Sequence, residues 1–266
     1  MTLNEIIKIY RSEGKITFTK QEALERSGLS RSAFYKSISR LQKKSRLIQP
    51  VQGFFVIVKP EDVHAGGPPP AYFIDQLMKY RNRTYYVGIL SAAAFHGASH
   101  QAPQVFQVIV DSSMRDIKKG RADIKFIKNG KIKNVITEEK KTPAGYIRTS
   151  TIEANAVDIV FYKKYAGGLD NVVNVLIELA SSGKISEEKL FTAAVEMHNK
   201  ATVQRLGYLL DKCEFSSLTG KLAKWVKENN LSRIPLSAGN SRKNANHNKK
   251  WHVLENREIE ADVSHK

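Results

Sequence analysis

Basic side chains dominate one short stretch of the chain, with six Lys or Arg and no acidic residue between Ser30 and Arg46. A guanidinium can donate two parallel hydrogen bonds to a guanine edge or a phosphate, and an ammonium pairs with phosphate as a point charge. Serine and tyrosine hydroxyls, which interleave these bases, donate to phosphate oxygens. A charge run is often only a solvated face, but this spacing favours contact with nucleic acid. The six bases are Arg31, Lys36, Arg40, Lys43, Lys44 and Arg46.

Two short helices must position these bases. Thr19 followed by Glu22 is a capping box, which predicts a helix that begins at about Lys20. Gly28 predicts a left-handed turn at the end of that helix, and Ser30 is the expected N-cap of the next one. The second helix carries its apolar residues at i, i+4 and i+7, which is one buried stripe, and its bases lie off that stripe. The stripe consists of Phe34, Ile38 and Leu41.

The residues from Leu47 to Val58 predict two short strands with a turn around Pro50 to Gly53. With an amphipathic helix over Leu3 to Tyr10, this order is a winged helix-turn-helix, whose second helix enters a DNA major groove. We expect Arg31, Ser32, Tyr35, Lys36 and Arg40 to face the groove, and Ser39 and Lys43 to meet phosphates. Gln52 would lie in the wing, near the minor groove or the DNA backbone.

The sequence predicts an α+β protein with two domains. Residues 1–64 would form the winged helix-turn-helix, and residues 65–70, Ala-Gly-Gly-Pro-Pro-Pro, would form a linker because neither helix nor sheet crosses three prolines. Residues 71–266 would form a larger mixed α/β domain, with strands first and a helical layer near the C-terminus. Within it, Ile124 to Ile127 and Ile132 to Val135 flank Asn129-Gly130, which predicts a hairpin with a type I′ turn.

Composition agrees with a polyanionic partner. The chain has 43 Lys and Arg against 26 Asp and Glu, a net charge of +17. A protein with this excess gains affinity for nucleic acid through counterion release. One cysteine, Cys213, excludes an internal disulfide and a cysteine-based zinc site. The absence of a signal peptide and of a long apolar run predicts a cytoplasmic protein without a membrane partner.

Catalysis has weaker signals. Asp123, Glu138 and Lys140 follow the order of a metal-dependent nuclease site, but such a match arises easily by chance in a lysine-rich chain. His96 and His100 have the i, i+4 spacing of two metal ligands, yet Gly97 interrupts the helix that would present them. No phosphate-binding glycine loop is present. We therefore expect no catalytic residue, no metal site and no cofactor.

Three segments of the second domain carry a family resemblance. The runs YYVGILSAAAFHGASHQAPQVFQVIV from Tyr85, TSTIEANAVDIV from Thr149 and GGLDNV from Gly167 resemble the type IV abortive-infection antitoxins, the AbiEi-like proteins. The order of an N-terminal winged helix and this α/β domain matches as well. Such proteins often have proline directly before the glutamate at the start of this helix, where this chain has Ser150-Thr151-Ile152-Glu153. Ser150 and Glu153 still predict a capping box there.

The resemblance implies an antitoxin that is not an enzyme. It would repress its own operon by binding inverted repeats in double-stranded operator DNA, and it would counteract a nucleotidyltransferase-type toxin without needing to bind it. Two alternatives remain from the residues themselves. One is a DNA-binding transcriptional regulator with a sensing domain and no toxin partner, and the other is the metal-dependent nuclease.

Overall fold

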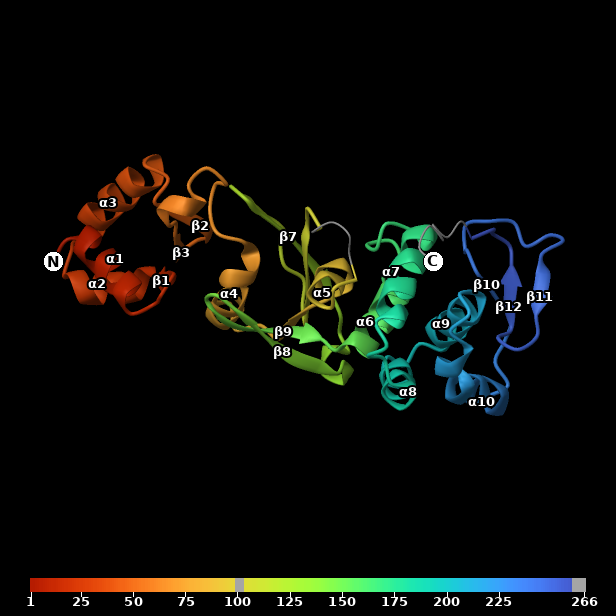
Figure 1. Ribbon diagram of the computed structural model, residues 1–266. Coiled ribbons are helices and arrows are strands. Elements are labelled where there is room, and N and C mark those ends of the chain that lie inside the picture. Colours follow the sequence, from red (N-terminus) through yellow and green to blue (C-terminus); the bar gives the residue numbers. More distant parts are fainter. Residues whose placement is uncertain (99–102, 260–266) are drawn as a thin grey trace. The chain divides into compact units, whose positions relative to one another are not determined.

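The computed structural model describes residues 1–98 and 103–259. Within them the chain has a mixed α+β fold with ten α-helices and three sheets (Figure 1). None of the helices in these two ranges is long and apolar enough to cross a membrane. The chain divides into two compact units, and the predicted linker 65–70 lies inside the first. The first unit comprises Met1–Tyr86, Gln104–Gly130 and Glu139–Arg148, and the second comprises Val87–Pro103, Lys131–Glu138 and the residues from Thr149 onward.

The first unit begins with three helices and a small sheet (Figure 1, red to orange). The three strands are antiparallel in the order β1-β3-β2, and β2 is irregular between Ile48 and Val51. In the chain, helix α3 follows α2 and precedes the β2–β3 hairpin. The elements are α1 (Leu3–Ser12), β1 (Thr17–Thr19), α2 (Lys20–Ser27), α3 (Arg31–Lys43), β2 (Leu47–Val51) and β3 (Phe54–Ile57).

Local side-chain chemistry sets the ends of α2 and α3. Thr19 Oγ1 accepts a hydrogen bond from the Glu22 amide at 3.2 Å, and Glu22 Oε2 accepts one from the Thr19 amide at 2.6 Å. This confirms the predicted capping box. Gly28 ends α2 with φ +65°, a left-handed conformation that favours glycine. Ser30 Oγ then accepts from the Ala33 amide at 3.3 Å, so α3 begins where the sequence predicts.

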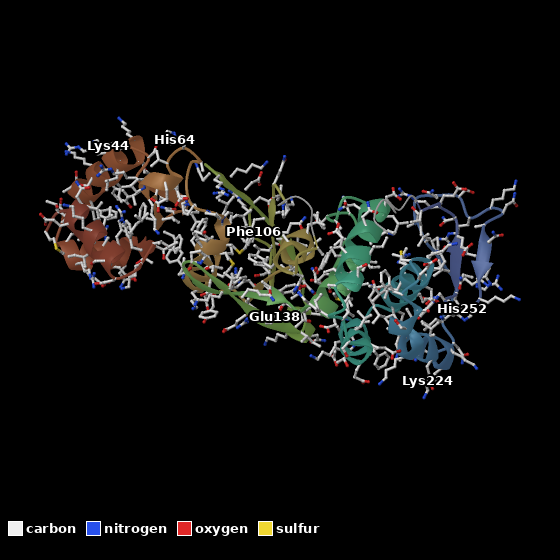
Figure 2. The ribbon with its side chains drawn as sticks, in the orientation of Figure 1. Lys44, His64, Phe106, Glu138, Lys224 and His252 are labelled. Carbon is white, nitrogen blue, oxygen red and sulfur yellow. The ribbon has the colours of Figure 1, made fainter. Side chains whose placement is uncertain are left out.

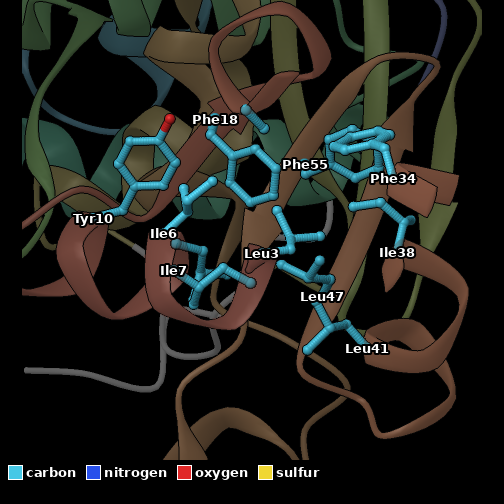
Figure 3. Packing of buried hydrophobic residues seen from close by; sticks show 12 residues of the cluster. Leu3, Ile6, Ile7, Tyr10, Phe18, Phe34, Ile38, Leu41, Leu47 and Phe55 are labelled. Atoms are coloured by element: carbon cyan, nitrogen blue, oxygen red, sulfur yellow. The ribbon is translucent and has the colours of Figure 1, made fainter. Parts of the chain in front are cut away.

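One apolar cluster holds these elements together (Figure 3). Phe34 of α3 is fully buried and meets the ring of Phe55 edge-on, with 5.9 Å between ring centroids. Phe55 also stacks on Phe18 at 5.2 Å. Because α3 buries only its apolar stripe, its polar face is left to solvent. The cluster comprises Leu3, Ile6, Ile7, Tyr10, Phe18, Ala23, Phe34, Ile38, Leu41, Leu47, Phe55 and Ile57.

A six-stranded sheet follows, with the order β6-β7-β5-β4-β9-β8. Strand β7 pairs in parallel with β5 and antiparallel with β6. Two 3-10 turns, η1 (Pro60–Asp62) and η2 (Pro70–Tyr72), and helix α4 (Ile74–Tyr80) lead into it. The strands are β4 (Tyr85–Val87), β5 (Phe106–Val110), β6 (Ile117–Lys119), β7 (Ala122–Lys128), β8 (Thr137–Thr142) and β9 (Gly145–Ser150).

The predicted hairpin at Asn129-Gly130 is wrong. A 3-10 turn, η3 (Ile132–Asn134), occupies the place of its second strand. Neither Asn129 nor Gly130 has the positive φ that a type I′ turn requires. The Asn129 amide instead donates to the carbonyl of Val110 at 2.8 Å, which extends the pairing of β5 with β7. The hairpin of β7 is made with β6, through Gly120.

Helices make up most of the second unit. Helix α6 is its centre and packs against α5, α7, α8 and α9, while α10 packs against α8 and α9. A small sheet of order β10-β12-β11 contacts α9 through β12. The elements are α5 (Ile89–Phe95), α6 (Ile152–Phe161), α7 (Leu169–Ser181), α8 (Glu187–Glu196), α9 (Lys200–Lys212), α10 (Gly220–Glu228), β10 (Ile234–Pro235), β11 (Asn246–Asn248) and β12 (Val253–Glu255).

The cap of α6 differs from the expectation by one residue. Thr151, not Ser150, is the N-cap, and its Oγ1 accepts from the Ala154 amide at 3.3 Å. Ser150 is fully buried at the end of β9 and so is held in the sheet. Glu153 closes no capping box, because its Oε1 accepts from the amide of Ser186, the residue before α8, at 3.2 Å.

Candidate nucleic-acid interface

The outer face of α3 presents seven of the eight residues that the sequence singles out. All seven side chains are exposed, and the Tyr35 ring, at 47% exposure, is one of the large apolar groups left at the surface. The structure brings these residues together on one helix face, opposite the buried stripe. They are Arg31, Ser32, Tyr35, Lys36, Ser39, Arg40 and Lys43.

The residues that the structure describes do not neutralise the charge on this face. In the described ranges no ion pair involves any of the six bases between Ser30 and Arg46. The first turn of α3 also carries no acidic side chain. Anions are favoured at a helix N-terminus, because free amides and the helix dipole point toward them. The face therefore has both side-chain and backbone groups available for phosphate.

Lys20 is a neighbour that the sequence reasoning missed. Its ammonium lies over the Tyr35 ring, 5.0 Å from the centroid. Tyr35 also meets Phe34 edge-on at 5.5 Å. These contacts fix the tyrosine ring at the start of α3 and add a seventh cation beside it. Lys20 is the first residue of α2, so its position follows from the α2–α3 turn and has no signal in the spacing of α3.

Gln52 lies apart from α3, on the turn between β2 and β3, and its side chain is exposed. Its carbonyl accepts a hydrogen bond from the Tyr80 hydroxyl of α4 at 3.0 Å. The Tyr80 ring also packs at a tilt against Phe54, with 5.4 Å between centroids. Gly53 has φ +80°, and a Cβ built on it would lie 2.6 Å from the Tyr80 hydroxyl, so a side chain there would displace the tyrosine. The turn is thus held against α4.

The residues of the nuclease-like pattern take part in other contacts. Asp123 forms an ion pair with Lys118 at 3.3 Å. Glu138 lies 3.8 Å from His96 Nδ1, and His96 Nε2 lies 2.9 Å from the carbonyl of Ser150. Across residues 1–98 and 103–259, no group of three His, Cys, Asp or Glu side chains could hold a metal ion. His100 lies outside the described residues. Burial raises the pKa of the Cys213 thiol, which disfavours the thiolate that a nucleophile requires.

Fold and surface together define an α+β protein whose N-terminal unit exposes an uncompensated basic helix. Residues 86–212, from β4 to the end of α9, match the family described as AbiEi antitoxin C-terminal domain. This match confirms the resemblance drawn from the sequence motifs. Through this domain, which covers nearly half of its length, the chain is similar to the AbiEi-like antitoxins. An antitoxin role in abortive infection is the function that this domain supports.

Among solved structures, the RV2827C protein from Mycobacterium tuberculosis superposes with a TM-score of 0.64 at 15% identity. The alignment covers 94% of this chain and 90% of that one, so the two share a fold along their length. An antigenic nucleotidyltransferase-like protein from Paracoccidioides brasiliensis gives a TM-score of 0.37 at 9% identity, over 57% of this chain and 89% of that one, a similarity too low to indicate a shared fold. No curated protein matches the chain by sequence.

Proposed function

We propose that residues 1–64 form a winged helix-turn-helix that binds operator DNA and represses the operon encoding this antitoxin. The order α1-β1-α2-α3-β2-β3 and the left-handed turn at Gly28 support this assignment. The observation that carries it is the outer face of α3, which exposes its bases with no acidic partner. Arg31 and Arg40 are the candidates for paired hydrogen bonds to guanine, and the lysines for phosphate contacts.

The antitoxin half of the proposal rests on the AbiEi-type domain and is assigned to residues 71–266, beyond the 65–70 segment. The partner in function would be a nucleotidyltransferase-type toxin encoded beside this chain, and neutralisation would not require a stable complex. Operator sites would be inverted repeats, since two copies of a helix-turn-helix reach half-sites about one helical turn apart. Both activities would operate in the cytoplasm.

The two activities are separable by substitution in the full-length chain. In cells that carry the toxin and a reporter driven by the operon promoter, Arg31→Ala/Arg40→Ala should abolish repression and preserve growth. Arg81→Ala is the matched control, because Arg81 is exposed in the same unit, beyond the end of α4, and lies outside α3. The control should behave as wild type in both readouts. Full repression by the double variant would refute the DNA-binding assignment, and growth arrest with wild-type protein would refute the antitoxin assignment.

A further inference from the structure

A groove of about 580 Å³ lies between α1, the C-terminal end of α3 and the segment after β3. Its floor is apolar and includes Ile7, Leu41 and Ile57. Its walls are basic, and no acidic side chain lines it. The charged or titratable lining residues are Lys8, Arg11, Lys44, Arg46 and His64. Lys44 and His64 are labelled in Figure 2 and lie at the same edge of the first unit.

These charges have no counter-ions among the described residues. In the part of the chain that the structure describes, no carboxylate pairs with the four Lys and Arg side chains of the groove. The acidic residues nearest in sequence have other partners: Glu13 pairs with Lys15 at 3.2 Å and with Arg26 at 3.1 Å, and Glu5 accepts from the Thr2 amide at 3.0 Å. The η1 carboxylates follow next. Glu61 faces Lys59 at 3.9 Å, and neither Glu61 nor Asp62 lines the groove. Four positive charges in one groove repel one another, and this repulsion destabilises the folded state. A bound polyanion would offset it.

Helix dipoles account for only part of the pattern. Arg11 stands in the last turn of α1 and Lys44 caps α3, where positive charge is favoured. Arg46 and His64 lie outside any helix, yet they line the same groove. The convergence of two helix ends and two loop residues therefore needs a further reason.

Further basic residues lie beyond both ends of the groove. An adjoining recess of about 330 Å³ shares Lys44 and Arg46 with it and adds Arg40, which belongs to the outer face of α3. At the other end of the groove, Gly66 follows His64 by two residues in the chain. Its backbone contacts the backbone of Gly120 in the β6–β7 turn: a Cβ built on Gly66 would lie 3.0 Å from the Gly120 Cα. Lys119 and Arg121 flank Gly120, are exposed and have no ion-pair partner among described residues.

We propose that this row of basic side chains binds the phosphate backbone of duplex DNA that flanks the base-reading contact of α3. We call it the basic strip, and it consists of Lys8, Arg11, Lys44, Arg46, His64, Lys119 and Arg121. The inference rests on the proposed DNA-binding function and deepens it by assigning a longer binding site. An extended polymer fits better than a single small anion, because the cations continue past the groove in both directions. Successive backbone phosphates match such a row, and the contacts carry no sequence information.

The test compares two duplexes bearing the same operator core, one short and one extended by about one helical turn on each side. Lys8→Ala/Arg11→Ala in the full-length protein should weaken binding to the long duplex by about 10- to 30-fold near 0.15 M salt. The slope of log K against log salt is negative, and its magnitude for the long duplex should decrease by about 2. Affinity for the short duplex should stay unchanged. Lys119→Ala/Arg121→Ala, at the other end of the basic strip, should give the same pattern.

The matched control is Lys15→Ala/Lys79→Ala, which removes the same charge from two residues of the first unit that form ion pairs with Glu13 and Asp75. It should leave the salt dependence of binding unchanged for both the long and the short duplex. Equal losses on both duplexes, or none on the long one, would overturn the inference while leaving the DNA-binding function in place. Saturable binding of inorganic phosphate or AMP that Lys8→Ala/Arg11→Ala removes, with DNA affinity unchanged, would also overturn it and assign a small-anion site. Failure of the wild-type protein to bind either duplex would refute the proposed function itself.

Discussion

The contact between Gly66 and Gly120 makes a sharp prediction about the first unit. Gly120 has φ +57°, and a Cβ built on it would lie 1.9 Å from the carbonyl oxygen of Gly66 and 2.8 Å from its carbonyl carbon. Both atoms belong to backbone, so no side chain can rotate away to make room. The β6–β7 turn and the segment after η1 can meet at this distance only because both residues are glycine.

Two costs add up in Gly120→Ala. A left-handed conformation costs an L-residue about 1–2 kcal/mol. Inserting a methyl group into a packed contact costs about 1–3 kcal/mol more, since the neighbouring backbone must shift. The substitution should therefore lower the free energy of unfolding of the first unit by roughly 2–5 kcal/mol. It should also weaken DNA binding at the basic strip, which runs across this contact.

Urea denaturation followed by circular dichroism measures the change, with Gly130→Ala as control. Gly130 has no positive φ, and a Cβ added to it would meet nothing within 4 Å. The control should remain within about 0.5 kcal/mol of wild type. A Gly120→Ala protein as stable as the control would show that the two turns do not touch in solution, and the continuity of the basic strip would fall with them.

Further predictions concern the two units separately. Phe34→Ala should destabilise the first unit by about 3–5 kcal/mol in urea denaturation, because the ring is fully buried. Tyr35→Ala, on the exposed face, should lower the stability by under about 1 kcal/mol and reduce DNA affinity instead. Equal losses of stability in the two variants would contradict the orientation of α3. Thr19→Ala removes a helix cap and should cost about 1 kcal/mol by the same measurement, with no change expected if the capping box is absent in solution. Burial opposes ionisation of Asp211, but hydrogen bonds from Lys250 and two other donors outweigh it and hold the pKa of Asp211 below its usual value. Its stabilising effect should thus be complete above about pH 4 and vanish as the pH falls through the lowered pKa, so an Asp211→Asn protein that kept this acid dependence of unfolding would contradict the assignment.

The parts of the structure predicted well from sequence are those fixed by neighbouring residues. The capping box of Thr19 and Glu22, the left-handed Gly28 and the cap Ser30 each depend on side chains within three positions. The buried stripe of α3 follows from helical spacing, and with it the exposed basic face. Local chemistry was therefore enough to place seven of the eight candidate interface residues on one surface.

Prediction from the sequence failed where contacts with distant segments of the chain determine the local structure. Asn129-Gly130 has the composition of a tight turn, but pairing with β5 extends past the end of β7 and prevents a hairpin. Ser150 and Thr151 can both cap a helix, and the burial of Ser150 in β9 selects the second. The basic strip combines α1, the end of α3, the residue His64 and the β6–β7 turn, which no sequence spacing brings together. Lys44 and Arg46 already belong to the basic run that the sequence assigns to nucleic-acid contact, whereas Lys8, Arg11, Lys119 and Arg121 join them only through the packing of the first unit.

The central claim is that the outer face of α3 recognises DNA from the operon that encodes this chain. Fluorescence-anisotropy titration of a duplex from the region upstream of the operon tests it directly, with wild type, Arg31→Ala and Arg81→Ala compared at one salt concentration. Arg31→Ala should bind more weakly than wild type by roughly 1–3 kcal/mol, with reduced preference for the operator over unrelated duplex, while Arg81→Ala should match wild type. Equal affinity of all three proteins for operator and unrelated DNA would contradict the claim.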